Sequence, residues 1–404
     1  MICVNSNTFK VFSGFYRGEV NMRVYIICPA RVYTGGPTAL FQLCHVLRNY
    51  YDVDAIMAFY NVRDLDPVNP NYRKFKCPWT TVSRVNDVSE SIIIVPETAM
   101  HFLEFFSKAR KVVYWLAVDN YVLSIYARRS LGSKVKVHLH ALVNSFARPF
   151  LILSIVPYLT EPREVSLLKP HRSLMYRAIL NAYFSEFVRH SIANKLVPIP
   201  NADLHIAQSI YAKGFLERSS VREGDIIILH EPLEEEYLIE AKKIDYDKKQ
   251  DIIAWNPRKT YPEAVKLVSI LRKRGINVID LWNVGKDRMI KILSKTKIFI
   301  DIGIHPGRDR PPREAVVLGN ITIVNNHGGC YRVEDCPIPS EFKLNCYTSC
   351  KIDYNKYAEE IEYYLENFDY YIKKFEPYRH LILSEPNEYL QDTKVLVEKL
   401  IKII

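Results

Sequence analysis

The stretch Ile298–Val324, IFIDIGIHPGRDRPPREAVVLGNITIV, decides the fold of this 404-residue chain. It opens with an apolar run, rich in β-branched residues, which predicts a strand buried on both faces over residues 298–302. A polar loop follows, and Pro311-Pro312 can only open a helix, which Gly319 ends. Residues 321–324 are again strand-like. The order strand, loop, helix, strand predicts a parallel sheet covered by helices.

The loop of this unit, His305-Pro306-Gly307-Arg308-Asp309-Arg310, is predicted to be exposed at the carboxyl end of its strand. Open parallel sheets bind ligands there, where helix N-termini offer free N–H groups. Cations beside a helix start suit a diphosphate, and a carboxylate suits sugar hydroxyls. The alternative is a solvated basic loop in which Glu314 only complements the helix dipole. The candidate binding residues here are His305, Gly307, Arg308, Arg310, Arg313 and Glu314.

The pattern HPGRDRPPREA, followed by Gly319 and a short apolar run, resembles the nucleotide-sugar site in the C-terminal domain of GT-B glycosyltransferases. In the large retaining group of that superfamily, this place carries two glutamates separated by seven residues. Glu314 matches the second, which implies a ribose ligand, and Pro306 stands where the first would be. The family's first glutamate contacts the donor sugar, so this departure leaves the sugar and the stereochemical outcome open. The string most resembles capsule and surface-polysaccharide transferases with HPG(K/R)DRxPREA.

Composition is that of a globular protein with more than one core. A length of 404 residues predicts two domains. A hydrophobic content of 48% with 25% charged residues argues against disorder. The net charge of +10 and the pI near 9.0 predict an anionic partner, which is a nucleic acid, a membrane surface or a phosphorylated substrate.

The eight cysteines include no C-x-x-C pair, and no secretory signal precedes them. This usage favours a reducing cytoplasm. Four of them lie between Cys330 and Cys350, where their irregular spacing favours buried thiols over a structural zinc site.

Residues 1–21 are interpreted as an N-terminal extension, with an added edge element as the alternative, and residues 24–28 as the first strand. A loop with Gly35 and Gly36 follows, before a helix that Pro37 is suited to open. The loop is not a dinucleotide-binding fingerprint. It resembles the N-domain glycine loop of GT-B enzymes, which faces the donor diphosphate and the acceptor. The alternative is an ordinary tight connection between strand and helix.

Further strands are predicted over residues 51–60, 91–95 and 111–117. The loops after the last two hold three candidate catalytic residues, Glu97, His101 and Asp119. A carboxylate placed there is suited to take a proton from an acceptor hydroxyl. The alternative for such an aspartate is a helix cap. Two Asp-x-Asp triplets, at residues 52–54 and 64–66, lack a second ligand cluster, so no metal site is predicted.

Residues 122–195 carry most of the net charge, an excess of roughly eight positive side chains. Within them the apolar run 141–159 is broken by Arg148-Pro149 and Pro157, which argues against a transmembrane span. Apolar residues among basic ones suit a helix lying in an anionic membrane interface. The alternative is a buried helix with a solvated basic face.

A short strand at 204–207 is interpreted as the last of the first domain. The second domain restarts with a strand at 251–255, followed by Arg258 and Lys259 beside a helix start. The resemblance implies that a basic residue here contacts the donor diphosphate. A strand at 277–282 and helices at 286–294, 359–368 and 393–404 complete the domain. The resemblance also implies that the last helix crosses back to the first domain.

The predicted fold is α/β, with two Rossmann-like doubly wound domains, residues 22–220 and 224–404, facing across a cleft. The insertion at 122–195 belongs to the first domain. The resemblance implies a metal-independent, hexosyltransferase-like enzyme that needs no cofactor. It would move a sugar from a nucleotide-diphosphate sugar to a glycan or lipid-linked acceptor hydroxyl in surface-polysaccharide biosynthesis.

We expect a cytoplasmic protein that can lie peripherally on the inner membrane face, with an anionic membrane surface as a partner and no nucleic acid. A GT-B-like nucleotide-sugar epimerase and a non-catalytic nucleotide- or glycan-binding protein are the alternatives. The sequence leaves open the base, the sugar, the acceptor, the catalytic base and the oligomeric state.

Overall fold

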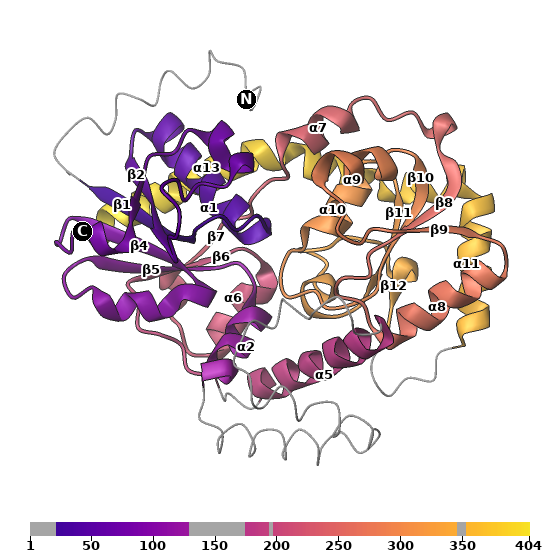
Figure 1. Cartoon of the computed structure of the whole chain (residues 1–404), viewed down its shortest axis with the longest axis horizontal. Coiled ribbons are helices and arrows are strands. Elements are labelled where there is room, and N and C mark those ends of the chain that lie inside the picture. The colour runs from indigo at the N-terminus through magenta and orange to yellow at the C-terminus, as the bar shows by residue number, and fades with distance from the viewer. Residues whose placement is uncertain (1–21, 129–173, 194–196, 346–352) are drawn as a thin grey trace. The chain divides into compact units, whose positions relative to one another are not determined.

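Two parallel sheets, one in each of two units, organise the chain in a computed structural model that describes residues 22–128, 174–193, 197–345 and 353–404 (Figure 1). The first unit contains residues up to 118, 198–235 and 384–404, and the second contains residues 119–197 and 236–383. The expected extension 1–21 and the apolar run 141–159 lie outside the described residues.

The sheet of the first unit has the strand order β3-β2-β1-β4-β5-β6-β7. Its central strands are continuous apolar runs because helices cover both faces of a parallel sheet. The strands are β1 Arg23–Pro29, β2 Asp54–Tyr60, β3 Trp79–Thr81, β4 Ser91–Pro96, β5 Arg110–Trp115, β6 Leu204–Ala207 and β7 Ile226–Ile228.

Two sequence-based boundaries in this unit are wrong. The strand expected to start at residue 51 starts at Asp54, because helix α1 (Gly35–Tyr51) continues to Tyr51 and ends on Asp52, whose φ is 55°. The strand at 204–207 is not the last of its sheet, because β7 pairs with it in parallel. The sheet therefore extends beyond residue 220, where the first domain was expected to end.

Helices and short 3-10 turns complete the first unit. Five apolar residues from the end of the last helix, α13 (Glu376–Ile403), belong to the same core cluster as β1 and α1. Helix α13 thus starts in the second unit and ends in the first. The other elements are η1 Pro70–Phe75, η2 Val82–Arg84, η3 Glu97–Phe105, α6 Ile210–Arg218 and η4 Glu223–Asp225.

The sheet of the second unit has the order β12-β11-β10-β8-β9, and every pair in it is parallel. Its strands are β8 Gln250–Trp255, β9 Asn277–Asp280, β10 Thr296–Asp301, β11 Ile321–Asn325 and β12 Lys343–Leu344. The stretch quoted first supplies β10, helix α10 (Arg310–Val317) and β11, as its pattern predicts. Strand β10 therefore lies between β8 and β11.

The remaining elements lie wholly or largely in the second unit. They are α2 Val118–Arg128, α5 Leu174–Ala193, α7 Glu235–Ala241, η5 Tyr246–Lys248, α8 Pro262–Lys273, α9 Lys286–Leu293, η6 Gly328–Tyr331, η7 Ser340–Phe342, α11 Tyr354–Glu366, α12 Phe368–Tyr371 and η8 Ile372–Phe375.

Helix α5 groups with the second unit, although residues 122–195 were expected in the first domain. It lies beside α8 (Figure 1). The Asn181 side-chain amide donates to the Thr260 carbonyl over 3.0 Å, and the Tyr261 hydroxyl lies 2.7 Å from the Ser185 hydroxyl. Among the residues that the structure describes, no helix is both long and apolar enough to cross a membrane.

Candidate functional site

Three loops that follow adjacent strands of the second sheet form the candidate site. They are residues 256–261 after β8, residues 302–309 after β10 and residues 326–331 after β11, which we call the loop cluster. Because the strands are parallel, all three loops leave the sheet at its carboxyl edge.

Backbone contacts hold the loop cluster together. The Ile304 N–H donates to the Lys259 carbonyl over 3.1 Å, and the Gly329 N–H donates to the His305 carbonyl over 2.8 Å. A Cβ atom added at Gly328 or Gly329 would lie 1.9 Å from the carbonyl oxygen of His305 or Gly307. Only glycine fits at these two positions, so their role in the cluster is close approach of backbone to backbone.

The loop after β10 is buried, which corrects the expectation of an exposed loop. His305 has no exposed surface, Arg308 is 4% exposed, and Arg313 of α10 is fully covered. Gly307 is also buried. The cause is the position of β10 between two strands whose own loops close over it.

A chain of polar groups runs through the cluster. The Lys259 ammonium lies 3.1 and 3.3 Å from the two carboxylate oxygens of Asp309. The His305 ring contacts Asp309 through Nδ1 and the Asp301 carbonyl through Nε2, each at 3.1 Å. The Asn256 amide donates to the Asp301 carboxylate over 3.1 Å. The sequence pointed to Lys259 and His305 but missed the other three residues.

The charges of this network depend on one another. Burial raises the pKa of Asp301 to about 6. Burial acts in the same direction on Asp309, but Lys259 and His305 outweigh it and hold the pKa of Asp309 below its usual value. For His305, burial acts to lower the pKa, and the hydrogen bond to Asp309 together with the nearby Asp301 carboxylate raises it overall.

Arg310 and Glu314 lie on the first turns of α10, and their side chains are 11% and 13% exposed. Arg310 Nε lies 4.0 Å from Glu314 Oε1. Among the residues that the structure describes, Arg310 Nε and Nη2 are buried without a hydrogen-bond partner. A buried guanidinium with open donors is a ready site for an anion. Arg258 is exposed at the rim of the cluster.

The start of α10 offers fewer N–H groups than an ordinary helix start. The helix begins at Arg310, so Pro311 and Pro312 occupy its second and third positions. Proline has no N–H. An anion at this place must therefore be held mainly by side chains.

In the first unit, Gly35 and Gly36 open helix α1, and Pro37 is its third residue rather than its first. Gly35 is exposed and Gly36 is partly buried. A Cβ atom at Gly36 would meet a Leu116 methyl at 3.6 Å, an ordinary contact. The contact of these glycines with a donor stays a prediction.

The three candidate catalytic residues follow β4 and β5. Glu97 begins η3, is 3% exposed and accepts the Leu116 N–H over 3.0 Å. Burial raises the pKa of Glu97 to about 7. His101 lies in the same 3-10 segment against the Phe102 ring, and Asp119 lies buried in the first turn of α2. Their catalytic roles stay predictions.

The Asp-x-Asp triplets are engaged in ion pairs. Asp54 lies 2.6 Å from Arg23 and 3.2 Å from Arg48, and Asp66 lies 2.7 Å from Arg73. Within residues 22–128, 174–193, 197–345 and 353–404, no group of three or more His, Cys, Asp or Glu side chains is arranged to hold a metal ion.

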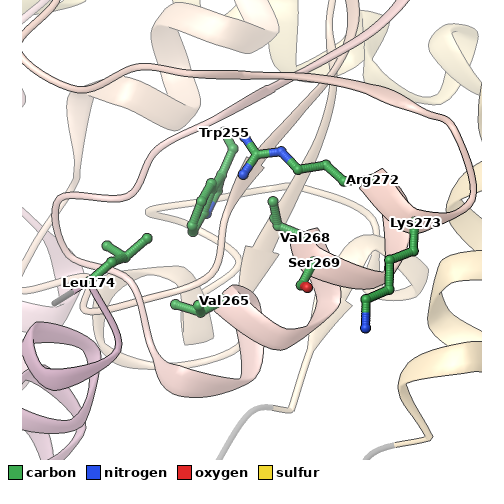
Figure 2. A pocket seen from close by; sticks show the side chains of 7 residues that line it. All are labelled: Leu174, Trp255, Val265, Val268, Ser269, Arg272 and Lys273. Atoms are coloured by element: carbon green, nitrogen blue, oxygen red, sulfur yellow. The ribbon is translucent and has the colours of Figure 1, made fainter.

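A separate hollow of about 340 Å³ lies beside helix α8 (Figure 2). Its lining combines apolar side chains with polar and cationic ones, and none of the predicted site residues belongs to it. The lining residues are Leu174, Trp255, Val265, Val268, Ser269, Arg272 and Lys273.

Comparison with known proteins gives structural likeness only. No protein-family model and no curated protein sequence matches the chain. HepE of Anabaena, solved with UDP-glucose, is 10% identical with a TM-score of 0.53, over 93% of this chain and 100% of HepE. A glycosyltransferase of Rickettsia africae is 13% identical with a TM-score of 0.53, over 95% and 99% of the two chains.

Sucrose-phosphate synthase of Thermosynechococcus elongatus is 11% identical with a TM-score of 0.53, over 95% of this chain and 100% of the synthase. These likenesses extend over both units. The fold is therefore the α/β, two-sheet GT-B fold that the sequence predicted.

Proposed function

We propose that this protein is a glycosyltransferase that moves a sugar from a nucleotide-diphosphate sugar to an acceptor hydroxyl. The observation that supports it most is the meeting of two cation-bearing loops in one unit. The loop with Lys259 and the loop leading to Arg310 share backbone hydrogen bonds at the carboxyl edge of the sheet. The likeness to HepE, whose structure contains UDP-glucose, supports the same ligand class.

In this proposal the donor diphosphate lies against the loop cluster. Lys259, whose side chain is 44% exposed, and the open donors of Arg310 bind its oxygens. Arg258 and Arg308 add positive electrostatic potential at the diphosphate. Arg313 of α10 is fully buried and adds to this potential without contacting the diphosphate. Glu314 accepts hydrogen bonds from the ribose hydroxyls, since its carboxylate lies beside Arg310 at the same helix start.

The reaction breaks the bond between the anomeric carbon and the oxygen of the distal phosphate, and forms a bond from that carbon to the acceptor oxygen. The leaving diphosphate carries away the bonding electron pair. Lys259 and Arg310 stabilise this developing charge, which is where fixed cations accelerate the reaction. The acceptor proton passes to a general base, for which Asp119, Glu97 and His101 are the candidates.

Finer features follow from the sequence. The string HPGRDRPPREA supports a hexosyl donor and an acceptor among surface glycans or their lipid-linked precursors. The positive excess of residues 122–195 supports peripheral binding to an anionic membrane on the cytoplasmic side. Catalysis would need neither a metal ion nor a cofactor.

The test is to incubate the protein with UDP-, GDP-, ADP-, CMP- and dTDP-linked sugars. Release of the nucleotide product is then followed by chromatography and the anomeric protons by NMR. Slow donor hydrolysis, accelerated by an acceptor, supports transfer. An isomerised sugar supports an epimerase, and binding without turnover supports a non-catalytic protein, so either result would overturn the proposal.

Lys259→Ala and Lys297→Ala form a matched pair for this test. Both lysines pair with an aspartate, Lys297 with Asp251 at 2.6 Å, but Lys297 lies at the amino end of β10. Lys259→Ala should lower donor turnover by about tenfold or more, as expected for a lost charge-assisted contact to phosphate. Lys297→Ala should leave turnover unchanged.

A further inference from the structure

Asp309 has the backbone of a helix N-cap but does not act as one. Its φ and ψ are −62° and 140°, directly before α10, yet its side chain caps no N–H. An N-cap carboxylate normally accepts from the N–H of the second or third helical residue. Here those residues are Pro311 and Pro312, which have none. The two prolines leave the Asp309 carboxylate available for other partners.

The carboxylate binds two groups of the donor site instead. It contacts the Lys259 ammonium at 3.1 Å and His305 Nδ1 at 3.1 Å, and its side chain is only 13% exposed. The other ring nitrogen of His305 lies 3.1 Å from the Asp301 carbonyl oxygen. A carbonyl oxygen and an ionised carboxylate only accept hydrogen bonds. Both nitrogens of His305 must then carry protons, so the ring is an imidazolium.

We propose that Asp309 is a positioning residue of the donor site, one that holds the Lys259 ammonium and the His305 imidazolium beside the diphosphate. This rests on the proposed function. One carboxylate between two cations reduces their mutual repulsion and leaves the three groups with a net positive charge. It also fixes Lys259, a long and half-exposed side chain that would otherwise spread over many rotamers.

The groups that face His305 come from every element packed against it. They are the Asp301 carboxylate of β10, Asp309 at the start of α10 and the Cys336 thiol. Lys259 of the β8 loop pairs with Asp309, the Gly329 N–H of η6 donates to the His305 carbonyl, and the Cys330 thiol of η6 lies against Cys336. Of these groups, the Asp309 carboxylate hydrogen-bonds directly to the ring, at Nδ1.

The first experiment follows the His305 side chain itself by NMR of nitrogen-15-labelled protein from pH 5 to 9. In the wild type both ring nitrogens should stay protonated to a pH above the usual histidine range. In Asp309→Asn the ring should lose a proton near neutral pH. A wild-type ring that titrates as an ordinary histidine would overturn the proposal, whatever the protein binds.

The second experiment measures binding of UDP, GDP and ADP by calorimetry. Asp309→Asn should lower the affinity for the nucleotide that the wild type prefers by about tenfold. This loss of affinity should grow as the pH rises, because His305 of the variant then loses its positive charge. Asp309→Glu should recover part of the affinity, because the carboxylate is kept. Asp251→Asn, which breaks the remote pair with Lys297, is the control and should bind as the wild type.

Replacing Pro311 and Pro312 by alanine tests the role of the prolines without touching the carboxylate. The new N–H groups compete for Asp309, so nucleotide affinity should fall while α10 is retained.

Unchanged nucleotide affinity and an unchanged pH profile in Asp309→Asn would refute the positioning role of Asp309. If the wild type bound no nucleotide, the proposed function would fail, and the NMR result would still decide whether Asp309 holds His305 charged.

Discussion

Lys259 and Gly303 meet backbone to backbone: a Cβ atom added at Gly303 would lie 1.9 Å from the Lys259 carbonyl oxygen. An isolated bridge between Thr260 and Gly303 joins the same two segments. This contact ties the loop after β8 to the loop after β10. The spacing between the Lys259 ammonium and the residues around Asp309 therefore depends on one glycine.

Gly303→Ala should push these loops apart. A buried Cβ at that distance forces the backbone to move, which typically costs about 1–3 kcal/mol of stability. Urea unfolding should show this loss, and nucleotide binding should weaken more than the stability change alone explains. Gly224→Ala is the control, because nothing lies within 4 Å of its added Cβ. Equal stability and equal nucleotide affinity of Gly303→Ala and Gly224→Ala would contradict the prediction.

Arg310→Met should separate stability from binding. Arg310 Nε and Nη2 are buried without a hydrogen-bond partner in the described part of the chain, and such a cation costs stability. The ligand-free variant should unfold at or above the wild-type temperature. It should lose the stabilisation of about 2.7 kcal/mol that a ligand at a hundred times its Kd confers.

The control for Arg310 is Arg274→Met, since Arg274 is paired with Glu359 and Glu362 at 3.0 and 2.6 Å. It should lower the unfolding temperature slightly and keep the stabilisation by nucleotide. A marked fall in the stability of ligand-free Arg310→Met would show that this side chain is already satisfied within the protein.

Glu97→Gln should flatten the pH dependence of stability. Burial raises the pKa of Glu97 from 4.5 to about 7, so the folded state favours the protonated acid. Wild-type stability is then lost as the pH rises through this range, by roughly 2–3 kcal/mol between pH 5 and pH 8. Glutamine still accepts the Leu116 N–H and does not ionise. Urea unfolding at several pH values measures the difference, and exposed Glu104→Gln should keep the wild-type slope.

Lys249 should make folding stability rise with pH, opposite to the effect of Glu97, and at higher pH. It is 6% exposed and donates to the Leu293 and Thr296 carbonyls at 2.9 Å, and burial lowers its pKa from 10.5 to about 7. The unfolded chain then binds the extra proton, so wild-type stability should rise by roughly 3 kcal/mol between pH 7 and pH 10. Lys249→Met should lack this rise, whereas exposed Lys242→Met should retain it. If stability changed with pH in the same way in Lys249→Met and Lys242→Met, the lowered pKa of Lys249 would be refuted.

Local patterns were enough to predict much of the second unit. The strand at 298–302, the helix after Pro311-Pro312 and the following strand appear as β10, α10 and β11 because apolar runs, prolines and Gly319 act on their own neighbours. Boundaries failed where a longer-range contact decided them. Strand β7 was missed because three isoleucines are too short a signal without the edge of β6 beside them.

The sequence by itself determined that two α/β units form and that basic residues follow β8 and β10, because these features follow from local composition and periodicity. The tertiary structure alone decided that His305 is buried, that Asp309 holds Lys259, and that Gly303, Gly328 and Gly329 bring three loops together. The physical reason is strand order. Hydrogen bonding places β10 between β8 and β11, and no local pattern in the chain encodes which strands become neighbours.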